Sequence, residues 1–135
     1  MVAFRDISIG KPVALVVESD PALRRLTSTI LRQNGYRVFE SGVGVEDWYI
    51  QGSECTVEVL VVGMNLAGGK SGLGVAKRVW EKNPTVRIII TGASSPDEKE
   101  MNVVRDAGMT FLSLPYSFGR LSQAAASQSS RAAVA

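Results

Sequence analysis

A glycine-rich stretch in the middle of the chain is the first place where residue types and spacing suggest chemistry. Residues 61–74 read VVGMNLAGGKSGLG, an apolar run that leads through Gly69-Lys70-Ser71 into a helical pattern. A phosphate-binding loop needs G-x-x-x-x-G-K-[ST], because its backbone amides surround the phosphates and its lysine reaches them. The first glycine here, Gly63, comes one residue too early. The spacing therefore disfavours a nucleotide loop, and leaves Lys70 as either a solvated loop lysine or a contact for a small anion.

Composition argues against several other kinds of site. The 135 residues include no histidine and a single cysteine, which argues against a zinc site and excludes an internal disulfide framework. No pairing of a nucleophile with a base is visible, so we expect no enzyme. A net charge of +2 is too balanced to indicate nucleic acid or an anionic membrane as a partner. No apolar run approaches the ~20 residues of a membrane span, and we expect a cytoplasmic protein.

Short apolar runs alternate with helical patterns along the chain. Continuous apolar runs are typical of strands buried on both faces of a sheet. Five strands are predicted in this way, at Val13–Val17, Tyr36–Phe39, Glu58–Val62, Val86–Ile90 and Thr110–Leu114. The predicted helices follow them, from 21 to just before Gly35, over 45–51 and 73–82, from 96 to 107, and from 118 onward. This alternation predicts a parallel sheet with helices on both faces.

Two helix starts carry strong signals. Asp20 precedes Pro21, and this is the arrangement of an N-cap followed by proline at the first helical position. The stretch Ser95-Pro96-Asp97-Glu98 is predicted to be a capping box that starts the fourth helix. For Asp20 we favour the capping role over a role in a metal site.

Sites in such sheets form where the carboxyl ends of the strands meet. At that edge the sequence resembles a known family. VALVVESDPALRRL (13–26) is similar to the opening of response-regulator receiver domains, IIITGA (88–93) to their fourth strand, and AGMTFLSLPY (107–116) to their fifth strand and the turn after it. The resemblance implies a CheY-like, flavodoxin-type (βα)5 fold, a three-layer α/β/α sandwich with strand order 2-1-3-4-5. It covers residues 12–122, with an extension at 1–11 and an Ala/Ser-rich tail at 123–135 that is either the end of the last helix or disordered.

Receiver domains carry a phosphoryl group on an aspartate at the end of the third strand, with magnesium held by that aspartate, an acidic pair and a backbone carbonyl. The resemblance places the phosphoacceptor at Gly63, which has no side chain. The acidic pair falls on Glu18 and Ser19, so one carboxylate is lost, and the carbonyl ligand falls on Asn65. With Asp20 as the only further acid nearby, we expect at most a vestigial metal site, no magnesium binding and no other cofactor.

Of the remaining family positions, two carry the residue type of the family and one does not. The hydroxyl switch residue falls on Thr91 and the switch aromatic on Phe111, and both are kept. The lysine that grips the phosphoryl group falls on Leu114 and is lost. A lysine facing a pocket stripped of two carboxylates would be costly to bury, so the losses at 19, 63 and 114 agree with one another. The stretch VVGMNLAGGKSGLG thus resembles a remodelled phosphoacceptor loop.

The resemblance implies an atypical receiver domain in signal transduction that acts by protein–protein contact without aspartate phosphorylation. Its expected partner is a signalling protein, with a histidine kinase or an output domain as candidates. A homodimer through the last two helices and the fifth strand is a further possibility. Two alternatives stay open: a sensor of small anions or nucleotides that uses Lys70 and the amides of the 63–74 loop, and a receiver phosphorylated at a displaced acceptor such as Asp20.

Overall fold

The computed structural model describes residues 10–52 and 55–126, which form five strands and five helices. The strands are β1 (Val13–Val17), β2 (Arg37–Ser41), β3 (Val57–Gly63), β4 (Arg87–Gly92) and β5 (Thr110–Ser113). The helices are α1 (Pro21–Gln33), α2 (Val45–Gly52), α3 (Gly72–Lys82), α4 (Glu98–Asp106) and α5 (Phe118–Ala126), with a 3-10 turn at Ala67–Gly69. The predicted strands agree with these bounds to within two residues at each end.

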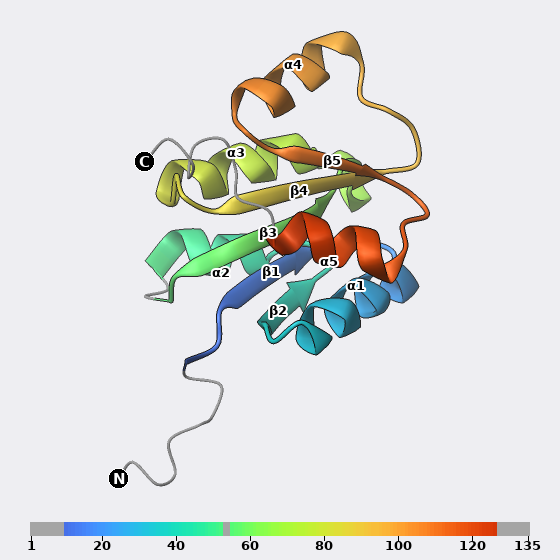
Figure 1. The fold of residues 1–135 in the computed structure, drawn as a ribbon. Coiled ribbons are helices and arrows are strands. Elements are labelled where there is room, and N and C mark those ends of the chain that lie inside the picture. The colour runs from blue at the N-terminus through green and yellow to red at the C-terminus, as the bar shows by residue number, and fades with distance from the viewer. Residues whose placement is uncertain (1–9, 53–54, 127–135) are drawn as a thin grey trace, which may run out of the picture.

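The strands form one parallel sheet in the order β2-β1-β3-β4-β5. Helices α1 and α5 cover one face of the sheet, and α2, α3 and α4 cover the other (Figure 1). The predicted three-layer fold and strand order are confirmed. Because every strand runs the same way, all five carboxyl ends lie at one edge of the sheet, where parallel α/β folds place their sites.

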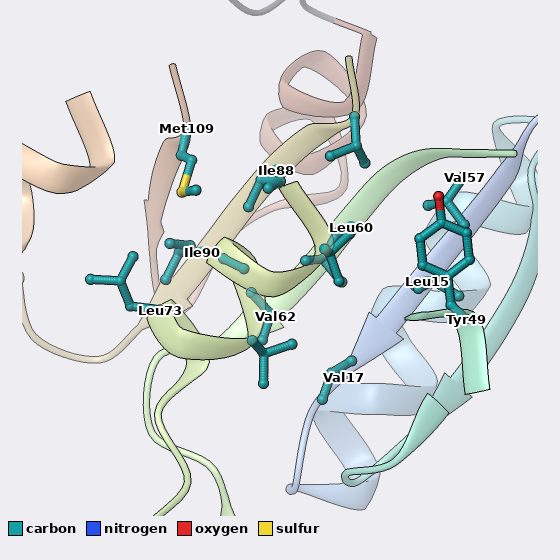
Figure 2. Close-up of a cluster of buried hydrophobic side chains, with 14 of the residues drawn as sticks. Leu15, Val17, Tyr49, Val57, Leu60, Val62, Leu73, Ile88, Ile90 and Met109 are labelled. Carbon is teal, nitrogen blue, oxygen red and sulfur yellow. The ribbon is translucent and has the colours of Figure 1, made fainter. Parts of the chain in front are cut away.

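The inner strands are buried on both faces, which is why they read as continuous apolar runs. Every residue of β1 is buried, and so is every residue of β3 except Glu58. The larger core cluster lies on the α2–α3–α4 face and includes Leu60 and Ile88 of the sheet; Tyr49 of α2 lies beside Leu15 and Val57 (Figure 2). A smaller core cluster lies on the α1–α5 face. The edge strand β2 buries only Val38 fully, so its pattern is more polar.

Helix α1 starts as predicted. The Oδ1 atom of Asp20 accepts hydrogen bonds from the amides of Ala22 and Leu23, at 2.9 and 3.2 Å. These amides belong to the first turn and have no partner within the helix. Asp20 is therefore a helix cap.

The predicted start of α4 is wrong by two residues. The N-cap is Asp97, which accepts from the amide of Glu100 at 2.7 Å, while the Glu100 side chain accepts from the amide of Asp97 at 3.1 Å. Both Ser95-x-x-Glu98 and Asp97-x-x-Glu100 fit the capping-box spacing. A charged acceptor interacts more favourably with the positive end of the helix dipole, which favours the second register.

Helix α5 continues to Ala126, with Ala125 buried in the smaller core cluster. Residues 123–126 of the Ala/Ser-rich stretch are thus helical, and the rest of the predicted tail and the first nine residues lie outside the described residues. None of the helices in the described part of the chain has the length and apolar character needed to cross a membrane.

The start of α3 lies in direct backbone contact with the end of β3. The amide of Gly72 donates to the carbonyl of Met64 at 2.8 Å. A Cβ atom on Gly72 would lie 1.8 Å from the carbonyl oxygen of Gly63, which no real contact allows. Only glycine permits this approach, and the approach sets the path of the whole 64–71 loop.

Replacing Gly72 by alanine should therefore destabilise the protein strongly. The clash is with backbone, so no side-chain rotation relieves it, and we expect the free energy of unfolding to fall by at least about 3 kcal/mol. Gly119→Ala in α5 is the matched control, because a Cβ there meets nothing within 4 Å. This control substitution should raise the free energy of unfolding by about 0.5–1 kcal/mol. Urea unfolding of both variants measures the difference; equal stabilities would contradict the contact.

Candidate functional site

Three of the predicted site residues come together at the carboxyl edge of the sheet. Gly63 pairs with Thr91 in the β3–β4 register. Glu18 follows β1, whose last residue, Val17, pairs with Val62. The Oε1 atom of Glu18 lies 2.9 Å from the point that a Cβ on Gly63 would occupy. A carboxylate is thus present beside the end of β3, but it reaches there from β1.

Glu18 is fixed by its neighbours. Its Oε2 atom accepts from the amide of Asp20 at 3.1 Å, and its backbone carbonyl accepts from Nη1 of Arg24 at 2.6 Å. Arg24 also lies 3.8 Å from a carboxylate oxygen of Glu40 on β2. The role of Arg24 could not be read from the sequence, because a helical pattern does not show which arginine turns back toward a strand end.

Ser19 ties the 64–71 loop to the end of β1. Its Oγ atom accepts a hydrogen bond from the amide of Ala67 at 2.7 Å, across 48 residues of sequence. Further along the loop, the amide of Leu66 donates to the carbonyl of Lys70 at 3.0 Å, and Leu66 itself is buried. The hydroxyl at position 19 thus holds a loop in place.

Two further residues from the predicted metal site, Asn65 and Asp20, lie at the surface. Asn65 is exposed and forms an isolated β-bridge with Ser71 at the base of the loop. Asp20 is exposed, and its side chain accepts from the first turn of α1. Among the described residues, no three His, Cys, Asp or Glu side chains are grouped so that they could hold a metal ion.

The predicted switch residues are both part of the packed interior. Thr91 is only 2% exposed. Phe111 is half-buried and packs against the larger core cluster. A Cβ on Gly92 would lie 3.2 Å from Cε1 of Phe111, so this ring lies close over the residue that follows Thr91. The Phe111 ring thus lies beside the end of the strand that carries Thr91.

The segment after β5 presents an apolar and a phenolic group to this edge. Leu114 precedes a cis peptide bond to Pro115 and packs against the smaller core cluster. The Tyr116 hydroxyl contacts Oγ1 of Thr27 on α1. Thr27 donates its own proton to the carbonyl of Leu23 at 2.8 Å, so Tyr116 must be the donor in that contact.

Burial raises the pKa of the Tyr116 phenol, and the bond with Thr27 partly offsets this. The negative charge of Glu18 raises this pKa further. Sequence reasoning missed Tyr116, because an aromatic after Leu-Pro reads equally well as a core residue.

Lys70 is partly exposed, and its ammonium group has partners on α2 that the sequence did not indicate. Its role as an anion contact stays a prediction. The Nζ atom of Lys70 lies 2.8 Å from Oε2 of Glu46, a residue of α2 that is fully buried, and 3.9 Å from Oδ2 of Asp47. Glu46 also accepts from the amide of Gly44 at 2.8 Å. A buried carboxylate needs such a partner. The ion pair therefore connects the 64–71 loop to α2.

A second ion pair continues from this one to α3. Arg78 donates to Oδ1 of Asp47 at 2.8 Å. This hydrogen bond holds the pKa of the Asp47 carboxyl below its ordinary value, with further help from the charge of Lys70. Because Asp47 lies at the surface, its pair with Arg78 contributes little to stability compared with the buried pair.

Removing the Lys70 charge should destabilise the protein, because the buried Glu46 carboxylate would lose its cationic partner. We expect Lys70→Met to lower the free energy of unfolding by about 3 kcal/mol, because Glu46 would stay buried without a cation. Lys77→Met is the control, since Lys77 is exposed on α3 and joins no ion pair of the described residues. Adding Glu46→Gln to Lys70→Met should recover part of the loss. Chemical denaturation of the four proteins tests this, and equal losses for the two lysines would refute it.

Stability should fall at alkaline pH through Tyr116 and Tyr49, because burial raises the pKa of both phenols above 10.0. As pH rises, the unfolded chain releases these protons at a lower pH than the folded protein does. The stability that the two phenols contribute is therefore fully present below about pH 10 and is lost as pH rises through their pKa values in the folded protein. Denaturation at about pH 9 and pH 11 measures the loss. The fall in stability between these two pH values should be smaller in Tyr116→Phe than in the original protein. An equal fall would mean that the pKa of Tyr116 is not raised in the folded state.

Comparisons with known proteins agree with this geometry. The profile of the response regulator receiver domain matches residues 14–126. None of the curated proteins matches the chain. A CheY-like receiver domain protein from Methanospirillum hungatei JF-1 is 17% identical, with a TM-score of 0.72 over 84% of this chain and 89% of that one.

Two further solved structures share the fold. A Burkholderia pseudomallei response regulator, solved with a phosphorylated aspartic acid, a calcium ion and citrate, is 19% identical; its TM-score is 0.71, over 91% of this chain and 69% of that one. The beryllofluoride-activated NtrC4 receiver domain dimer is 19% identical, with a TM-score of 0.70 over 84% and 92%. The profile match, the strand order and the polar groups at the carboxyl edge agree, and the chain belongs to the response regulator receiver domain family of two-component signalling.

Proposed function

We propose that this receiver domain signals through protein–protein contact and takes no phosphoryl group at the end of β3. The observation that carries the proposal is Gly63, the last residue of β3, which offers no carboxylate for phosphoryl transfer. The nearest carboxylate among the described residues belongs to Glu18 of the β1 end, and its Oε1 atom lies 2.9 Å from the point that a Cβ on Gly63 would occupy. Members of the family are generally signalling modules without enzymatic activity of their own.

The other groups at this edge support the proposal. Leu114 provides no cation for a phosphoryl oxygen, and it packs against the smaller core cluster. A magnesium ion fits the donor set poorly, because no three acidic, histidine or cysteine side chains of the described residues are grouped to hold a metal ion. Asp20 caps α1, and Ser19 accepts from the amide of Ala67. On this proposal the domain needs no magnesium and no other cofactor.

The surface formed by α4, β5 and α5 is the proposed contact for a signalling partner, such as a histidine kinase or an output domain. Strand β5 pairs only with β4, so its outer edge is open within the described residues. Figure 1 shows α4 at the top, beyond this edge strand. A cavity of about 220 Å³ lies between β5 and α5, lined by Thr110, Phe111, Leu112, Arg120, Gln123 and Ala124. A homodimer, the state named for the NtrC4 receiver, would use the same surface.

Both alternative functions draw on groups that already have partners. An anion sensor would rely on Lys70, whose ammonium group pairs with the buried Glu46. A displaced acceptor at Asp20 would have to give up the two amide hydrogen bonds that start α1. Losing such a cap costs about 1 kcal/mol. Each alternative function would therefore require an existing contact to break before the group could bind a ligand or accept a phosphoryl group.

The proposal predicts that the protein neither binds beryllofluoride with magnesium nor gains mass from acetyl phosphate. The backbone amides of Glu18, Gly63 and Thr91 should keep their NMR positions during a titration with magnesium and beryllofluoride. The Burkholderia pseudomallei regulator, whose aspartate is phosphorylated in its structure, serves as the positive control.

Each contrary result points to a different function. An acyl phosphate on any carboxylate of the intact domain would overturn the proposal, and mapping it to Asp20 would establish the displaced acceptor. Saturable shifts confined to 64–72 that also occur without magnesium would favour the anion sensor. Lys70→Arg keeps the charge that Glu46 requires, and so tests Lys70 as an anion contact without unpairing the carboxylate.

A further inference from the structure

A cavity opens at the amino edge of the sheet, where β1, β2 and β3 begin. Its volume is about 470 Å³, and its lining includes Lys11, Pro12, Val13, Arg37, Thr56 and Glu58. This volume falls within the range of pockets that hold small molecules, and it exceeds that of the cavity between β5 and α5. No residue of the strand-end site lines it, so it is a separate place on the molecule.

A β-bulge in β3 places Glu58 outside the ladder next to this cavity. Where β1 pairs with β3, Val13 pairs with Val57 but Ala14 pairs with Val59, so Glu58 is an extra residue. The pairing of β3 with β4 begins only at Val59. Glu58 is also the one exposed residue of β3. Bulges often lie next to functional sites, where they redirect a side chain, and this bulge presents a carboxylate at the cavity.

Arg37 is held in position by an aromatic pair. Its Cζ atom lies 5.0 Å from the centroid of the Phe39 ring, and the centroid of the Trp48 ring on α2 lies 5.0 Å from that of Phe39. A guanidinium group that stacks on a ring keeps the N–H groups at its edge available for two parallel hydrogen bonds to a carboxylate. Arg37 is thus oriented without using the donors that recognise an anion.

The three charged side chains of the cavity are not paired with one another. None of Lys11, Arg37 and Glu58 forms a salt bridge within residues 10–52 and 55–126. In contrast, Glu40 on the same strand as Arg37 has two arginines within 4.0 Å. The cavity therefore offers two cations and one anion to a ligand. A molecule with two anionic groups and one cationic group would satisfy all three.

We propose that this cavity binds a free amino acid with an acidic side chain. One carboxylate of the ligand pairs with the guanidinium of Arg37, the second with the ammonium group of Lys11, and the amino group with the carboxylate of Glu58. Hydrogen bonds between charged groups are stronger than those between neutral groups. The inference goes beyond the proposed function, because it adds a small ligand to a domain that otherwise acts through protein contact.

An NMR titration of the whole chain with L-glutamate tests the site. We expect saturable shifts of the backbone amides of Val13, Arg37 and Glu58, while the amides of Gly63 and Thr91 at the opposite edge stay in place. Glutarate has both carboxylates and no amino group, so it leaves Glu58 without a partner. It should therefore bind at least about tenfold more weakly than L-glutamate.

Two variants separate the roles of the charges. Arg37→Gln should weaken both ligands at least about tenfold. Glu58→Gln should weaken L-glutamate but not glutarate, because only the amino group of the ligand pairs with residue 58. Arg25→Gln is the matched control for charge, since Arg25 is exposed on α1 and does not line the cavity. The side chains of residues 37 and 58 are exposed, so both variants keep the core intact.

Several results would overturn the inference. They are the absence of saturable shifts with L-glutamate, an equal effect of Glu58→Gln on both ligands, and an equal loss of binding in Arg25→Gln and Arg37→Gln. Inorganic phosphate that binds as tightly as L-glutamate would also overturn it, because a simple anion site would then account for the cavity. These titrations contain no phosphodonor or metal ion. The proposed function is therefore tested separately, by the titration with beryllofluoride and magnesium.

Discussion

Two backbone segments touch at the carboxyl edge of the sheet, and the site takes its shape from that contact. The first residue of α3, Gly72, lies so close to the carbonyl of Gly63 that no side chain fits between them. The loop from Met64 to Ser71 must therefore leave β3 and return to the same point within eight residues. It closes on itself through the bonds of Leu66 with Lys70 and of Gly72 with Met64. Everything else at this edge is arranged around a loop of fixed path.

The polar groups around that loop bind one another. Ser19 accepts from Ala67, Lys70 pairs with Glu46, and Arg24 donates to the carbonyl of Glu18. A buried or half-buried polar group without a partner costs free energy, so the polar groups at this edge are stable because they find partners inside the protein. This internal pairing explains how a receiver fold persists with glycine at the end of β3 and leucine before the cis proline.

The fold could be predicted from the sequence because its signals are local. Runs such as Val13–Val17 and residues 88–90 are apolar on both faces, and burial on both faces of a parallel sheet requires that. The cap of α1 was equally clear, since Asp20-Pro21 allows one register. The start of α4 was placed wrongly because two capping boxes overlap there, and only the helix that forms selects Asp97. Strand ends differed by up to two residues, where the pattern of burial changes gradually.

The α/β architecture and the residue types at the strand ends follow from the amino-acid sequence alone, because strand and helix patterns and family motifs are read along the chain. The contacts of those residues emerge only when the chain is folded. Lys70 and Glu46 are 24 positions apart, and no pattern in the intervening residues indicates that α2 buries a carboxylate beside the 64–71 loop. The carboxylate of Glu18 reaches Gly63 because β1 and β3 are neighbours in the sheet. Such contacts depend on how layers pack in space, and that packing is a property of the whole domain.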